Sequence, residues 1–243
     1  MNISGPGFAL PAYVGAPAGR GEGIACLAAV TGASLAGIDK STQDGRDWTG
    51  MCLEWFNGKN GQGVALNGPS SGTGGSFWYE IFPGVLLTQL ADLHPSRADL
   101  AGAVSTMADR WRGACEGLGG KDADFDWTGF DLAAGKPVFN GLWREPDAAA
   151  GIGWIEYAAW RRWGDPRHLE AACWCADFLE RRKAEAGSPL YEVLLYYAPV
   201  LAARLNAEEG RRYDVDKLVQ WCLSENRGPG GRPDRAQGHG HLD

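Results

Sequence analysis

Two short segments of this chain place a serine, a tyrosine and a glutamate at the same relative positions. They are SFWYE at 76–80 and SPLYE at 188–192, and each opens an apolar segment. A serine at a helix start and an acid in the first turn are common helix-start features. Each glutamate lies four residues after its serine, whereas a capping box needs three, and capping gives the tyrosines no role. Glu80 and Glu192 are therefore candidate catalytic carboxylates as well as helix-start residues. The rings that could stack on a sugar face are those of Trp78, Tyr79 and Tyr191.

The segment LWREPDAAAG at 142–151 combines a ring, a cation and two acids. Trp143 offers a face for a sugar, and Arg144 can hydrogen-bond hydroxyl groups or a uronate. Glu145 and Asp147 flank a proline, a pattern that is also common helix punctuation. A Trp-Arg-Glu sequence is costly to bury, so we expect it to be exposed, with Glu145 and Asp147 as candidate catalytic acids.

Two loops carry further acids and aromatic rings. Alternating acids, bases and rings suit sugar binding, because hydroxyl groups prefer charged partners, although the same residues make ordinary surface turns. The alternating acids of 122–131 lack the glycine and final glutamate of a calcium-binding loop, so no metal ion is expected. The candidate sugar-binding residues in the loops at 41–50 and 122–131 are Asp44, Arg46, Asp47, Trp48 and Trp127.

Glycoside hydrolysis needs two carboxyl groups, one protonated and one acting as base or nucleophile, and requires no cofactor. A lyase, an epimerase or a zinc enzyme would be expected to use a histidine at the site. The four histidines lie in predicted hairpin turns or in the C-terminal segment, so the residues favour the hydrolase over these alternatives.

The bulk composition excludes some classes of partner. A net charge of −7 without any basic run argues against nucleic acid. No segment approaches the roughly 18 consecutive apolar residues that would span a membrane. We see no signal peptide, and the six cysteines lack a C-x-x-C motif. Buried free thiols in a cytoplasmic protein are the default interpretation.

Apolar residues at three-and-four spacing predict an all-α array of αα-hairpins. Short polar connections join the two helices of each pair, which makes the helices antiparallel neighbours. The segment TGASL at 31–35 suggests a fainter copy, and 39–76 contains Asn-Gly pairs that predict a small irregular or β excursion. One helical domain is expected over 1–226, followed by a disordered tail at 227–243. The predicted helix pairs are 77–93 with 97–117, 147–163 with 167–183, and 189–208 with 214–224.

The segment WREPDAAAGIGWIEYAAWRRWGDPRHLEAACWCADFLERR resembles the (α/α)6 toroids, the six-hairpin fold of many glycoside hydrolases and some polysaccharide lyases. The resemblance covers roughly 76–224 and rests on the helix pairs and their turns. It implies a sugar-binding cleft at the N-terminal ends of the inner helices. The repeat spacing leaves room for about four hairpins, so part of a toroid is expected.

The first hypothesis is therefore a carbohydrate-active protein, a glycoside hydrolase or a fragment of one, acting on an oligo- or polysaccharide without a cofactor. A non-catalytic helical-repeat protein that binds a glycan or another protein is the alternative from a different class. A polysaccharide lyase is a further alternative, as is a pure scaffold whose tryptophans only fill the core. The catalytic candidates are Glu145, Asp147, Glu80 and Glu192.

Overall fold

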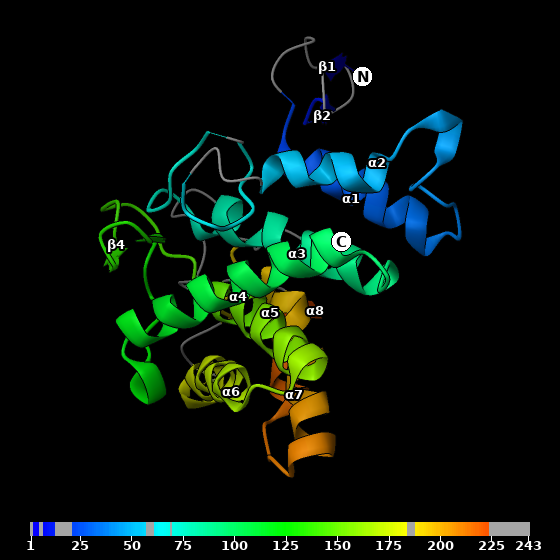
Figure 1. The fold of residues 1–243 in the computed structure, drawn as a ribbon. Helices are drawn as coiled ribbons and strands as arrows, with labels where there is room; N and C mark the ends of the chain where they lie inside the picture. The colour runs from blue at the N-terminus through cyan, green and yellow to red at the C-terminus, as the bar shows by residue number, and fades with distance from the viewer. Residues whose placement is uncertain are drawn as a thin grey trace. The chain divides into compact units, whose positions relative to one another are not determined.

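The chain folds predominantly into helices, as the sequence predicts, with two short antiparallel two-stranded sheets among the described residues (Figure 1). This structure is a computed structural model. It describes residues 2–4, 7–12, 21–56, 61–68, 70–183 and 188–223. The tail predicted at 227–243 lies outside the described residues.

The chain forms two compact units, and the single domain expected over 1–226 stays a prediction. Unit 1 comprises Met1–Gly72 and Tyr79–Arg110, and unit 2 comprises Thr73–Trp78 and Trp111–Asp243. Two helices pass from one unit to the other, and each unit is described by itself.

Unit 1 contains a strand pair and four helices, or parts of helices, joined by 3-10 turns. Its core is formed by apolar residues such as Leu27, Trp55, Leu66 and Ile81, all nearly inaccessible to solvent. The elements are β1 (Asn2–Ser4), β2 (Gly7–Ala9), α1 (Gly23–Leu35), η1 (Gln43–Gly45), α2 (Trp48–Met51), η2 (Cys52–Trp55), most of α3 (Phe77–Leu93) and the first part of α4 (Ala98–Gly117).

One prediction for unit 1 is wrong, and another holds only in part. The segment 31–35 is the end of α1, and Leu35 is 68% exposed, so it does not begin the second helix of a hairpin. The described residues of 39–76 are irregular, with short helices, turns and bends, so the irregular alternative holds and the β alternative does not. Gly61 and Gly63 have positive φ, and residues 61–68 form bends and coil.

Pro83 lies inside α3 without ending the helix. Proline has no amide hydrogen, so the carbonyl group four residues earlier loses its helical donor. That carbonyl belongs to Tyr79, and the amide of Asn67 donates to it at 3.2 Å. Pro83 thus leaves the Tyr79 carbonyl free to accept this bond, which ties the loop at 61–68 to α3 within unit 1.

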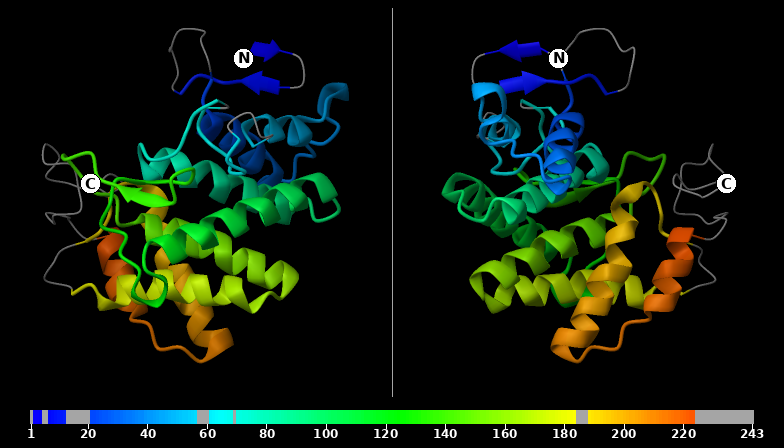
Figure 2. Two further views of the ribbon diagram at one scale, coloured as in Figure 1. Left: turned by 60° about the vertical axis from the view of Figure 1, so that its left-hand side comes forward. Right: turned by 90° about the vertical axis from the view of Figure 1, so that its right-hand side faces the viewer.

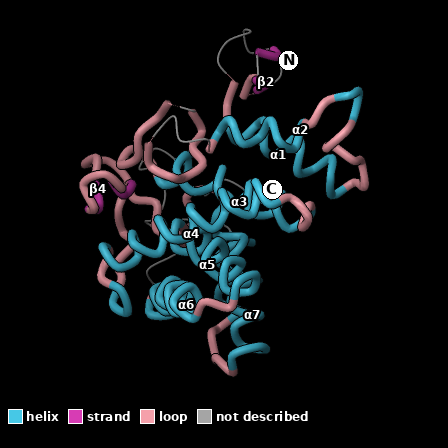
Figure 3. Tube along the Cα trace, in the orientation of Figure 1, coloured by secondary structure: helices cyan, strands magenta, loops and turns pink. Residues whose placement is uncertain are grey.

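Unit 2 is built from the start of α3, the end of α4 and two further helix pairs (Figure 2). The segment between α4 and α5 consists mainly of loops around a small strand pair (Figure 3). The elements are η3 (Gly120–Asp122), β3 (Gly129–Asp131), β4 (Lys136–Val138), α5 (Ala148–Trp163), α6 (Pro166–Arg181), η5 (Val193–Tyr196), α7 (Tyr197–Glu209) and α8 (Val215–Leu223).

The turn between α5 and α6 follows directly from its sequence, GDP. Gly164 ends α5 in the left-handed conformation, with φ 73°, and its amide donates to the carbonyl of Trp160. Asp165 caps α6 by accepting from the amide of Arg167 at 2.9 Å, and Pro166 occupies the first helical position. Two residues therefore separate antiparallel helices.

Small residues let α5 pack closely against both α6 and α7. A Cβ atom added at Gly153 would lie 2.7 Å from Leu201 Cδ2 and 3.0 Å from Cys175 Cβ. A buried pair, His168 Nδ1 and Glu156 Oε2 at 2.7 Å, links α5 to α6. The absence of a side chain at Gly153 thus permits the close approach of α5 to its two neighbours.

The predicted helix over 189–208 starts later than expected. Residues 188–192 are coil and bend, followed by η5, and α7 begins only at Tyr197. Pro199 therefore falls in the first turn of α7, where an amide hydrogen has no intrahelical acceptor. The other five predicted helices agree with α3, α4, α5, α6 and α8 to within two residues at either end. No helix in the described part of the chain is long and apolar enough to cross a membrane.

Candidate functional site

The site is assembled in unit 2, where the loops before α5 meet the start of α3. The amide of Phe77, the first residue of α3, donates to the carbonyl of Thr128 at 2.7 Å. The amide of Glu145 donates to the carbonyl of Trp127 at 2.8 Å, and the Thr128 hydroxyl donates to the carbonyl of Trp143 at 2.8 Å. These bonds bring together segments that lie far apart in the sequence.

Glu145 is the centre of this assembly. Its carboxylate accepts from the Ser76 hydroxyl at 2.8 and 3.0 Å, from the Trp78 amide at 2.7 Å and from the Trp143 indole at 2.8 Å. The side chain is completely buried, contrary to the expected exposure of the Trp-Arg-Glu sequence. Burial is tolerated because three donors surround the charge and the start of α3 contributes its dipole. Glu145 therefore holds the first turn of α3 in place.

Asp147 performs a similar task for the segment that leads into α7. Its Oδ2 atom accepts from the amides of Tyr191 and Glu192 at 3.1 and 2.9 Å. Its Oδ1 atom is buried and has no hydrogen-bond partner among the described residues. Burial, opposed by the bonds from those amides and reinforced by the charges of Glu145 and Glu192, raises the pKa of Asp147 well above its usual range. Its surroundings thus favour the protonated form of Asp147.

Glu192 is the one acid of this group whose side chain is partly exposed. It directly precedes η5, and its backbone is extended, with φ −142° and ψ −155°. Tyr191 beside it is buried, with 4% of its surface exposed. A ligand approaching the three acids would therefore reach Glu192 before Glu145 or Asp147.

A set of aromatic rings borders the same loops. The Trp78 and Trp143 side chains are half-buried, and Arg144 is exposed. The Arg144 guanidinium lies 4.3 Å from the ring centre of Phe139 and 5.9 Å from that of Trp127. It also donates to the carbonyl of Asp126. Rings and a charged donor thus lie together next to the buried acids.

Eight of the predicted site residues belong to this network of unit 2. The bonds and ring contacts above connect them through the loops at 126–147 and 188–192. They are Trp78, Trp127, Trp143, Arg144, Glu145, Asp147, Tyr191 and Glu192.

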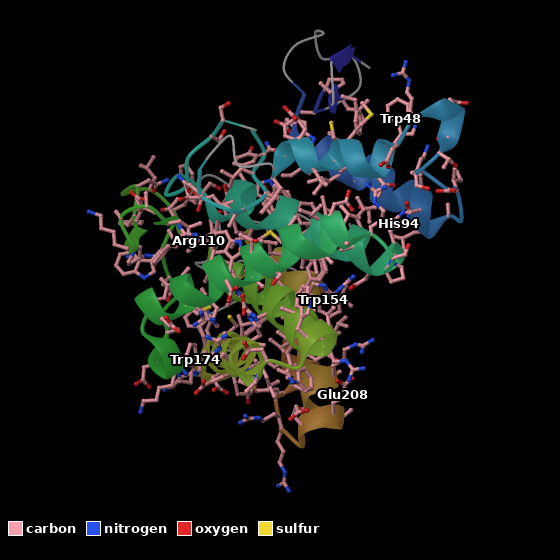
Figure 4. The ribbon with its side chains drawn as sticks, in the orientation of Figure 1. Trp48, His94, Arg110, Trp154, Trp174 and Glu208 are labelled. Atoms are coloured by element: carbon pink, nitrogen blue, oxygen red, sulfur yellow. The ribbon has the colours of Figure 1, made fainter. Side chains whose placement is uncertain are left out.

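The other six predicted residues belong to unit 1. Glu80 is buried within α3, whereas Tyr79 is 45% exposed. Asp47 caps α2 through the amide of Gly50 and bonds to Arg97, each at 2.8 Å, which gives it a structural role. Trp48, labelled in Figure 4, is a core residue whose indole donates to the carbonyl of Gln43. The two remaining exposed side chains are those of Asp44 and Arg46.

Two contributors were not predicted as site residues. Ser76 was identified only as a helix-start residue, and its hydroxyl is a donor to Glu145. Phe139 was not singled out, although it is 42% exposed beneath Arg144. An apolar ring directly before the Asn-Gly pair of the turn at 140–141 was the available signal, since such turns lie at the surface.

The chemistry open to this arrangement follows from accessibility and protonation. Rings and an arginine can hold a sugar, and two acids in different surroundings are the groups that acid–base catalysis uses. No group of three or more metal-ligating side chains that could hold an ion occurs in the described ranges.

Comparisons with protein-family models, with curated proteins and with solved structures find no match. The functional argument therefore rests on the geometry.

Proposed function

We propose that this chain is a carbohydrate-active protein that binds a glycan at the helix starts of unit 2. One observation carries the proposal. The half-buried rings of Trp78 and Trp143 lie on the bonded network of Glu145, next to Arg144 on its aromatic support. The exposed surface of a half-buried ring can stack on a pyranose while packing fixes the rest of the side chain. The hydroxyl groups of the sugar can hydrogen-bond to the side chains of Arg144 and Glu192.

The proposed architecture is part of an (α/α) toroid, with α3, α5 and α7 as inner helices. The bonds of Glu145 to the start of α3 and of Asp147 to the segment before α7 support it, because both acids sit immediately before α5. The start of α3, the start of α5 and the segment that leads through η5 into α7 are thus joined, which is the type of connection that an inner ring of helices would need.

Glycan binding is tested by titrating the chain with a panel of oligosaccharides and following the tryptophan fluorescence. Trp127→Ala and Phe139→Ala are expected to weaken binding by about 2- to 10-fold each, the range for loss of one ring interaction. The matched control is Trp174→Ala, which removes a half-buried ring from α6 (Figure 4). Absence of binding to the whole panel, or an equal loss in the control, would overturn the proposal.

A glycoside hydrolase is the second candidate, favoured by the bond from the Glu192 backbone amide to the Asp147 side chain, which brings the two acidic residues together. The reaction needs a protonated acid and an ionised partner. Burial raises the pKa of Asp147, and the partly exposed Glu192 donates its amide to that same side chain. Hydrolysis of a bound oligosaccharide should then be abolished by Asp147→Asn and by Glu192→Gln, with binding retained. Turnover unaffected by both substitutions would exclude this pair.

A further inference from the structure

The cationic side chain of the site is unusually well supported. Arg144 is exposed, yet its guanidinium rests on Phe139, with Trp127 beside it, and one nitrogen donates to the carbonyl of Asp126. An arginine on a surface usually keeps several rotamers, and binding must then order it. Here the contacts with two rings and a carbonyl hold the planar group before a ligand arrives.

No described carboxylate neutralises this charge. Arg144 contacts the backbone carbonyl of Asp126. The carboxylate of Asp126 instead accepts from Arg182 at 3.0 and 3.2 Å. Asp124 accepts the amide of Asp126 at 2.9 Å. The carboxylate of the neighbouring Glu145 is turned to Ser76, Trp78 and Trp143. The acids around Arg144 are thus engaged elsewhere.

We propose that Arg144 selects acidic glycans, those that carry uronate carboxylates, over neutral ones. This inference rests on the proposed glycan-binding function. A guanidinium presents parallel N–H groups that match the two oxygens of a carboxylate, and a sugar hydroxyl offers no such pair. Phe139 is 42% exposed, so the part of its ring that the guanidinium leaves uncovered can contact the apolar face of the same sugar or of its neighbour.

The test compares uronic acid oligosaccharides with their carboxyl-reduced counterparts, which have the same backbone without the charge. Affinities of the full chain are measured by calorimetry for both sets. The wild type is expected to bind at least one acidic member about 10-fold or more tightly than its reduced form, as for a charge-assisted bond. Added salt should weaken the acidic complex and leave the neutral one nearly unchanged.

Variants at one position assign the preference. Arg144→Met keeps a long apolar chain over the ring and should bind acidic and reduced forms equally, whereas Arg144→Lys should retain part of the preference as a point charge. Arg212→Met, at an exposed arginine between α7 and α8, is the control and should behave as wild type.

The outcomes separate this inference from the function on which it rests. Equal binding of acidic and reduced oligosaccharides by the wild type would refute acidic selection and leave glycan binding intact. Binding of neither set would refute both. A preference that survives in Arg144→Met would refute the role of this residue, because the selection would then arise elsewhere.

Discussion

Replacing Glu145 tests whether a buried carboxylate holds the loops before α5 against the start of α3. The Ser76 hydroxyl, the Trp78 amide and the Trp143 indole all donate to it within 3.0 Å. Glu145→Ala removes the acceptor of all three bonds at a side chain that is completely buried. At about 1–1.5 kcal/mol for each, the free energy of unfolding should fall by about 3–5 kcal/mol.

Glu145→Gln distinguishes the loss of an acceptor from the loss of volume. The amide keeps the shape of the side chain but offers one acceptor oxygen, and its NH2 group must face a donor. We expect a loss of about 1–3 kcal/mol, since part of the network survives. Ser76→Ala should cost about 1 kcal/mol alone and much less in the Glu145→Ala background, because both changes remove the same bond.

Urea unfolding followed by circular dichroism measures these differences. The matched control is Glu170, an exposed acid on α6, where substitution to alanine should change stability by less than about 0.5 kcal/mol. If Glu145→Ala were no more destabilising than Glu170→Ala, the carboxylate would not hold this junction and the account of the site would be wrong.

Three further predictions concern unit 2 and the thiols. Because the raised pKa of Asp147 lets the folded chain keep a proton that the unfolded chain releases above about pH 4, stability should fall as the pH rises from there toward the folded pKa. Asp147→Asn should remove this dependence in urea titrations, while Asp147→Ala should cost about 2–3 kcal/mol by stranding two amides; equal losses in both variants would contradict the assignment. In thermal unfolding, Gly153→Ala should lower the stability by about 1–3 kcal/mol, because the added methyl group would contact Leu201. Gly113→Ala, where the methyl group meets open space on α4, should raise the stability by about 0.5–1 kcal/mol. A change of the same sign in both variants would contradict the packing. Burial raises the pKa of Cys26 to about 11 and of Cys222 to about 12. Near pH 8 the native chain should therefore react with a disulfide reagent far more slowly than the urea-unfolded chain. Rapid modification of these two thiols in the native state would be inconsistent with their burial.

The helices of the pairs α3–α4 and α5–α6 were predictable because the sequence signals that mark them are local. Leu100, Met107 and Trp111 follow a helical stripe, and the GDP turn states where α5 ends and α6 begins. The start of α7 was not predictable in the same way. Ser188 does accept from the amide of Leu190, yet it also donates to the carbonyl of Trp221, and the chain continues as coil.

The roles of the site acids depend on partners that lie far along the chain. The sequence placed Glu145 and Asp147 at a helix start, which is where they lie. Exposure of Glu145 was expected because its local sequence does not reveal the donors that make burial tolerable. Those donors come from residues 76–78 for Glu145, and the donors to Asp147 come from residues 191–192. Arg144, in contrast, was expected at the surface and is exposed, since nothing distant is needed to keep a charged side chain in water.

The two acids flanking Pro146 also bear on how freely the hairpins could be gained or lost. Glu145 bonds to a residue 67 positions earlier, and Asp147 bonds to one 45 positions later. In an array of interchangeable repeats each unit touches only its neighbours through similar surfaces, and one unit can be removed without leaving unmatched groups. Here, deletion of the α7–α8 pair together with the segment 188–196 that leads into it would remove both amide donors of Asp147. Deletion of the start of α3 would remove the Ser76 and Trp78 donors of the buried Glu145. The hairpins of unit 2 are therefore not modular, and a change in their number would require simultaneous change in the segment that precedes α5.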